Sequence, residues 1–99
     1  PADVERASAP AALQPFAPLP ELALPFPARV VASDSDPFSL PLRSARMAAL
    51  WQSPLHWLRD AGHINVASGH KQWQDGFAQL AALLTDIRQQ TQPRAAACA

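Results

Sequence analysis

An acid and a histidine in this chain stand where two predicted strands end. Asp36 closes the run Arg-Val-Val-Ala-Ser-Asp-Ser-Asp at residues 29–36, and His63 lies within Asp-Ala-Gly-His-Ile-Asn at residues 60–65, just after a second apolar run. A carboxylate that holds an imidazole in one tautomer allows the imidazole to act as a general base toward a serine hydroxyl. The two contexts therefore predict two of the three groups of a serine-hydrolase triad.

The identity of the acid stays open at this stage. Asp34 lies two residues nearer the predicted strand and competes with Asp36 for the same role. Asp36 precedes Pro37, which biases its backbone toward extended conformations, so that its side chain leaves the strand end at a turn. Turn formation or capping would also explain an Asp-x-Asp-Pro loop without catalysis. We favour Asp36 because its combination with His63 carries more weight than either residue alone.

Alternating strands and helices must position these residues. Residues 28–33 and residues 55–58 are each typical of a short strand. Between them, Pro41 suits the first turn of a helix that runs to about Trp51. The order strand, helix, strand, helix predicts an α/β fold with one parallel βαβ unit and a C-terminal helix. The carboxyl ends of both strands then meet at one edge, which is where open α/β sheets bind ligands.

Each predicted helix has a periodic set of apolar residues. The helix from residue 41 carries Leu42, Ala45, Ala49 and Leu50. The C-terminal helix is expected from about residue 73 to residue 89, and its predicted apolar face comprises Trp73, Phe77, Leu80, Ala81, Leu84 and Ile87. Apolar residues at this spacing form the stripe with which an amphipathic helix usually covers a core.

The first 27 residues carry seven of the eleven prolines. Proline fixes φ and removes a backbone donor, so a regular helix or a central strand is not expected there. The expected organisation is a proline-rich covering loop at 1–27, part of an α/β domain at 28–92 and a flexible tail at 93–99. Because two strands alone seldom make a stable sheet, the middle part is expected to be the C-terminal portion of a larger domain.

The composition argues against several classes of partner. The 8 basic residues balance the 8 acidic ones, so nothing in the composition suggests a nucleic-acid partner, and no apolar run has the length of a membrane span. The start of the chain lacks the features of a signal peptide. The single cysteine, Cys98, cannot form an internal disulfide, which fits a reducing compartment, and we expect a cytoplasmic protein. The sequence does not begin with Met, so we also expect that it was processed or cut from a longer chain.

Several of these motifs together resemble a known family, the small α/β-hydrolases related to retinoblastoma-binding protein 9, in their carboxyl half. The resemblance spans roughly residues 10–85 and rests on the proline-rich approach at 16–27, Asp36-Pro37, the run 60–65 and Ser68-Gly69. It implies that Asp36 is the triad acid and His63 the triad base. It also implies an esterase- or amidase-like serine hydrolase that acts on a small ester or amide, without a metal or an organic cofactor.

The sequence departs from this family at the nucleophile. The family's serine sits on a Gly-x-Ser-x-Gly elbow upstream of the acid. Here the three glycines, Gly62, Gly69 and Gly76, all follow the acid, and no serine stands in such an elbow. We therefore expect the chain alone to be inactive and to act with a missing N-terminal half. The alternative is a non-catalytic interaction module that binds such a half, or a second copy, through an exposed sheet edge.

Overall fold

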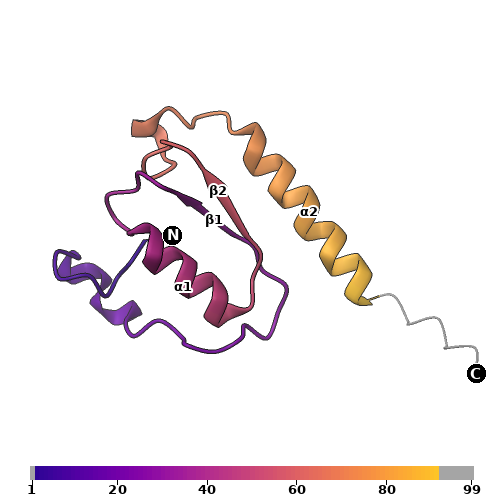
Figure 1. The fold of residues 1–99 in the computed structure, drawn as a ribbon, viewed down its shortest axis with the longest axis horizontal. Coiled ribbons are helices and arrows are strands. Elements are labelled where there is room, and N and C mark those ends of the chain that lie inside the picture. The colour runs from indigo at the N-terminus through magenta and orange to yellow at the C-terminus, as the bar shows by residue number, and fades with distance from the viewer. Residues whose placement is uncertain (1, 92–99) are drawn as a thin grey trace, which may run out of the picture.

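The computed structural model describes residues 2–91, which form a small mixed α/β structure (Figure 1). Two strands pair in parallel, with Val30 opposite Leu55 and Ser33 opposite Leu58. In the view of Figure 1 the two α-helices lie on opposite sides of this sheet. The elements are a 3-10 helix η1 (Ala11–Phe16), β1 (Val30–Ser33), α1 (Pro41–Trp51), β2 (Leu55–Leu58), a 3-10 helix η2 (Val66–Ser68) and α2 (Gln74–Thr91). This order confirms the predicted βαβ unit with a helix after it.

Helix α1 has the predicted bounds because both of its ends are encoded locally. Pro41 stands at its first turn, where a missing N–H leaves no helical bond unmade. At the other end Gln52 adopts a left-handed conformation with φ 52°, and its N–H donates to the carbonyls of Ala48 and Ala49. Pro54 follows and cannot continue the helix. The buried face, however, consists of Ser44, Met47 and Ala48 rather than the predicted set.

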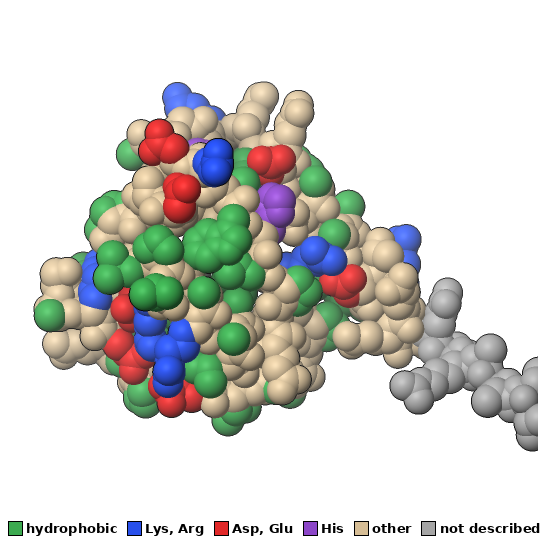
Figure 2. Space-filling model, viewed as in Figure 1, with side chains coloured by type: hydrophobic (Ala, Val, Ile, Leu, Met, Phe, Trp, Pro, Cys, Tyr) green, Lys and Arg blue, Asp and Glu red, His purple; other side chains and the backbone are tan. Residues whose placement is uncertain are grey.

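None of the four apolar residues predicted to be periodic in α1 is buried. Leu42 is 86% exposed, and the preceding Leu40 is exposed as well. Figure 2 shows hydrophobic side chains gathered on the surface over α1. The inward face instead combines the small Ser44 and Ala48 with the longer Met47, whose side chain is 2% exposed.

The two strands differ in burial. In β1, Val30, Ala32 and Ser33 are buried, whereas in β2 both His56 and Trp57 are exposed. The N-terminal strand begins at residue 30 rather than at the predicted residue 28, because residue 30 is the one that pairs with the first residue of β2. Within residues 2–91, β1 is therefore the more enclosed strand and β2 the more exposed one.

The proline-rich segment is irregular apart from one short 3-10 helix, which the sequence did not predict. Helix η1 tolerates Pro15 because its terminal turns are closed by Leu13, which donates to Pro10, and by Ala17, which donates to Gln14. Further on, the segment passes the carboxyl end of α1, where the Trp51 indole donates to the Pro20 carbonyl at 2.8 Å. Its role as a cover over the sheet stays a prediction.

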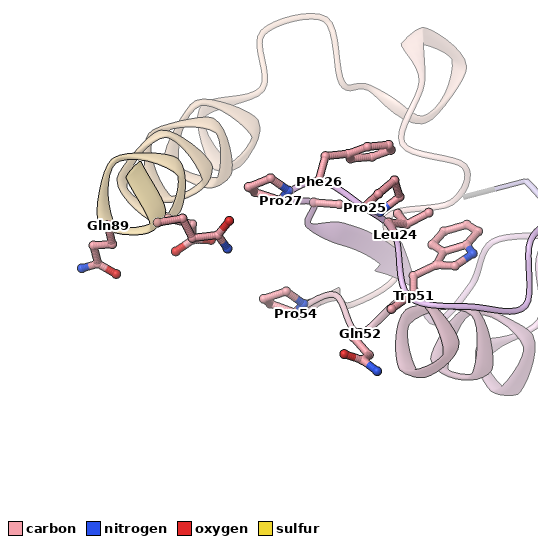
Figure 3. A pocket seen from close by; sticks show the side chains of 12 residues that line it. Leu24, Pro25, Phe26, Pro27, Trp51, Gln52, Pro54 and Gln89 are labelled. Atoms are coloured by element: carbon pink, nitrogen blue, oxygen red, sulfur yellow. The ribbon is translucent and has the colours of Figure 1, made fainter. Parts of the chain in front are cut away.

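A hollow lies where this segment, α1 and α2 approach one another (Figure 3). It has a volume of about 660 Å³. Its walls include Phe26, Trp51 and Pro54 on one side and Gln89 of α2 on the other. Because Pro54 directly precedes β2, this hollow lies at the amino ends of the strands, opposite to the edge where ligands of α/β sheets bind.

Helix α2 presents a different face to the protein from the one predicted. Its half-buried residues include Gly76, Gln79 and Asp86. The Arg29 guanidinium anchors this face through two bonds to the Asp86 carboxylate, at 2.9 and 3.3 Å, and one to Gln79 at 3.4 Å. Most of the predicted apolar face is exposed, including Phe77 at 73%. The two strands of the described chain are too narrow a sheet to cover that face as well.

Two further predictions concern the C-terminal tail and the absence of a membrane-spanning segment. The tail at 93–99, with Cys98, lies outside the described residues. Among residues 2–91, no helix combines the length and the apolar character that a membrane crossing requires.

Candidate active site

Asp36 and His63 meet at the carboxyl edge of the sheet. Asp36 follows the end of β1 by three residues and His63 follows the end of β2 by five. The imidazole Nδ1 lies 3.1 Å from Oδ1 and 3.0 Å from Oδ2 of the Asp36 carboxylate. The structure therefore brings together the two side chains that the sequence analysis singled out.

In this contact the imidazole Nδ1 donates and the carboxylate accepts. The Asp36 side chain is 3% exposed and the His63 side chain 31% exposed. An ionised carboxylate only accepts hydrogen bonds, so the proton of the neutral imidazole must sit on Nδ1. Nε2 then carries the lone pair, and among residues 2–91 it has no hydrogen-bond partner. The pair thus presents a basic nitrogen, oriented from behind by a buried acid.

Phe38 supports both members of the pair. Its backbone N–H donates to Oδ1 of Asp36 at 2.8 Å. Its ring meets the His63 ring edge-on, with the centroids 4.7 Å apart at 68°. The Arg6 guanidinium lies 4.9 Å from the centroid of the same ring. The sequence analysis missed Phe38, although its position directly after Asp36-Pro37 could have indicated a residue near the acid.

Asp34, the rival acid, has another partner. Its Oδ1 accepts a hydrogen bond from the backbone N–H of Asp60 at 2.7 Å. No hydrogen bond joins it to His63 within the described part of the chain. The geometry therefore places Asp36, and not Asp34, against the imidazole.

The loop that carries His63 has an unusual backbone. Asp60, Gly62 and Ile64 have φ angles of 49°, 59° and 55°, so every second residue around the histidine is left-handed. A Cβ at Gly62 would lie only 3.0 Å from Cβ of Ser68, so the turn is also crowded. Ser68 is itself fixed by a capping box with Asn65. The sequence indicated the glycine turn but not the two left-handed residues beside it.

A second serine–histidine contact lies nearby and serves the turn. Ser68 Oγ is 3.1 Å from Nδ1 of His70, but the same oxygen accepts from the N–H of Asn65 at 2.9 Å. No carboxylate among residues 2–91 bonds to His70. Nor does that part of the chain contain a group of three or more His, Cys, Asp or Glu residues arranged to hold a metal ion.

Comparison with known proteins places the chain among serine hydrolases. A family model described as Serine hydrolase matches residues 1–82. Among solved structures, a YdeN-like hydrolase from Pectobacterium atrosepticum superposes with a TM-score of 0.65 at 31% identity, over 69% of this chain and 37% of that one. A search of curated proteins gave no match. The chain therefore spans little more than a third of the length of the solved hydrolase. Because the family match extends over most of its residues, the chain belongs to the serine hydrolase family.

Proposed function

We propose that this chain supplies the acid and the base of a serine-hydrolase triad in an α/β-hydrolase domain, and that the nucleophilic serine lies on a part of the domain outside these 99 residues. One observation carries the proposal: the contact of 3.0 Å between His63 Nδ1 and the buried Asp36 carboxylate. The family match and the absence of a Gly-x-Ser-x-Gly elbow support it. The likeness to the small hydrolases related to retinoblastoma-binding protein 9 belongs to the same proposal.

The chemistry follows from the geometry of the pair. Nε2 of His63 takes the proton from the serine hydroxyl as its oxygen attacks the carbonyl carbon of a small ester or amide. The imidazolium then gives that proton to the leaving alcohol or amine, and an acyl-enzyme remains. Water then attacks the acyl carbon while the same histidine takes its proton; the acyl group leaves as a carboxylic acid, and the imidazolium returns the proton to the serine oxygen. Asp36 stays ionised throughout, holding Nδ1–H and stabilising the imidazolium.

The rest of the domain would occupy surfaces that are exposed here. Phe77, Leu80 and Leu84 of α2 are 73%, 51% and 45% exposed, which is unusual for an apolar helix stripe. A further part of an α/β sheet would cover this stripe. The alignment with only 37% of the solved hydrolase supports such a division.

The test combines this chain with the part of the YdeN-like hydrolase outside the aligned segment and measures hydrolysis of a p-nitrophenyl ester. A fluorophosphonate probe reports the reactive serine in the same complex. Asp36→Asn and His63→Gln should each lower kcat by several orders of magnitude, since triad members act as one unit. Asp75→Asn, which changes an exposed acid at the start of α2, is the matched control. An Asp36→Asn complex that turns over as fast as the wild type would contradict the proposal.

A second candidate is a non-catalytic interaction module, favoured by the same exposed stripe on α2. Its partner would be the missing half or a second copy paired along the sheet edge. The two functions differ in solution behaviour. A monomer of 10.6 kDa that unfolds cooperatively favours an independent module, whereas an aggregate favours a separated part of a hydrolase.

A further inference from the structure

Three consecutive side chains, beginning with the last residue of β1, hold three consecutive amides of the histidine loop. Ser33 Oγ accepts from the N–H of Ala61 at 3.0 Å. Asp34 Oδ1 accepts from the N–H of Asp60 at 2.7 Å, and Ser35 Oγ accepts from the N–H of Gly62 at 3.0 Å. We propose that Ser33, Asp34 and Ser35, here termed the strand-end clamp, are positioning residues that hold His63 against Asp36. The inference rests on the proposed hydrolase function for its catalytic consequence, but not for its structural part.

The clamp begins where the main-chain ladder ends. The last main-chain hydrogen bond between the β1 segment and the β2 segment runs from the N–H of Asp34 to the carbonyl of Leu58, at 3.2 Å. Beyond it, the side chains of residues 33–35 bridge the two segments in place of backbone carbonyls. Beyond the strands, the chain after β1 and the chain after β2 are therefore joined through side chains. The Asp36 and His63 side chains make their contact just beyond these bonds.

Ser33 is the central member because one oxygen serves both loops. Its Oγ accepts from Ala61 and also from the N–H of Ser35 at 3.3 Å, which uses both lone pairs of a hydroxyl. Ser33 is fully buried and Ala61 is 8% exposed, so water cannot replace this bond. A buried N–H without an acceptor is strongly unfavourable. The exposed Asp34 and Ser35 can exchange their partners for water and should matter less.

The backbone of the histidine loop explains why a clamp is needed. Asp60 and Ile64 are left-handed without being glycine, with φ angles of 49° and 55°. Such residues persist only where the surrounding structure over-determines them. The clamp fixes the amides of residues 60–62, directly before the histidine. Without it, the loop would relax toward ordinary φ values and carry the imidazole away from the carboxylate.

The first measurement is the Nδ1–H resonance of His63 in the 99-residue chain, labelled with ¹⁵N-histidine. A proton held between imidazole and carboxylate exchanges slowly and is visible, whereas a free imidazole N–H exchanges with water and disappears. Ser33→Ala should abolish this resonance. Ser44→Ala is the matched control, because it removes an equally buried hydroxyl, bonded to Ser39 at 2.9 Å, away from the loop.

A second pair of variants guards against a fold that does not survive Ser33→Ala. Ser35→Ala should broaden the resonance, and Ser35→Thr, which keeps the hydroxyl at an exposed position, should restore it. The inference is overturned if the resonance survives Ser33→Ala and Ser35→Ala, or if Ser44→Ala abolishes it equally. In the latter case, the effect would report general stability rather than positioning.

The catalytic consequence is read separately in the complemented enzyme. Ser33→Ala should lower kcat by about 100-fold with little change in KM, as expected for a displacement of about 1 Å in a reacting group. If no variant, including the wild type, shows turnover while the resonance responds as described, the proposed function fails and the clamp stands. If turnover depends on Asp36 but not on Ser33, the clamp fails and the proposed function stands.

Discussion

Replacing Gly62 with alanine tests how closely the turn before His63 is packed. Gly62 has φ +59°, and an alanine Cβ would lie 3.0 Å from Cβ of Ser68. The left-handed conformation alone costs an L-residue about 1–2 kcal/mol. Forcing a methyl group into a filled space adds about 1 kcal/mol at the lower end of the usual range. We expect Gly62→Ala to reduce the free energy of unfolding by about 2–3 kcal/mol.

Gly69→Ala is the matched control. Gly69 is also left-handed, with φ +88°, but no atom lies within 4 Å of the position of its missing Cβ. Gly69→Ala should therefore reduce the free energy of unfolding only by the cost of the left-handed conformation, about 1–2 kcal/mol. The difference between the two variants isolates the contact with Ser68. That contact cannot relax cheaply, because Ser68 and Asn65 hold each other in the capping box.

Equilibrium unfolding in urea measures both variants, since a change in midpoint at constant slope is a change in stability. Gly62→Ala should be the less stable by about 1 kcal/mol, and it alone should weaken the His63 Nδ1–H resonance. Equal losses in the two variants would refute the reasoning, because the crowding at Ser68 would then have no energetic consequence.

Four further substitutions test other parts of the fold by the same unfolding assay. Met47→Ala should reduce the free energy of unfolding by about 2–5 kcal/mol, because Met47 is 2% exposed. Leu42→Ala, at an 86% exposed position, should stay within about 0.5 kcal/mol of the wild type. Similar losses in the two variants would contradict the assigned core. Gln52→Gly should raise stability by about 1 kcal/mol, since glycine adopts the left-handed helix end without strain; a lower urea midpoint would argue against that conformation. Arg29→Met should cost about 1 kcal/mol or less, and less again in high salt, because its pair with Asp86 is partly exposed; a loss independent of salt would argue against an ionic anchor.

The elements around the site were predictable because local signals define them. Pro41 and Pro54 bracket α1, and the acids after residue 33 end the first strand, so both ends of α1 and the end of β1 followed from backbone chemistry alone. The meeting of Asp36 with His63 followed from topology, because neighbouring parallel strands end at the same edge. In these cases few residues, all close in sequence, decide the outcome.

The faces of the helices were not predictable in the same way. Apolar periodicity suggested that Phe77 and Leu84 of α2 would be covered, yet both are exposed, and the half-buried face carries Gln79 and Asp86. Which face is buried depends on the partner that is present. Here, that partner is the Arg29 side chain, 50 or more residues away in sequence. Periodicity reports that a helix has an apolar face, but not what covers it.

The clamp escaped the sequence analysis for a related reason. A serine or an aspartate after a strand is an ordinary turn residue, and its type does not tell which amide it will accept. The register that sets Ser33 opposite Leu58 decides that residues 33–35 face residues 60–62. Asp34 was considered as a catalytic acid for its type and position, whereas its observed hydrogen bond is to the backbone of Asp60.

Under the proposed function, the triad is divided between this chain and the remainder of the domain, and the arrangement of the site would allow this. Asp36 and His63 lie close together because one βαβ crossover joins two neighbouring strands, so the pair needs no further strand to form. The proposed nucleophile would have no such local link, since it would approach the opposite nitrogen, Nε2, which has no hydrogen-bond partner among residues 2–91. In the proposed hydrolase, the Asp36–His63 contact therefore forms without the part of the domain that carries the serine. The Nδ1–H resonance should accordingly be present in the chain alone, while ester hydrolysis should require the remainder of the domain.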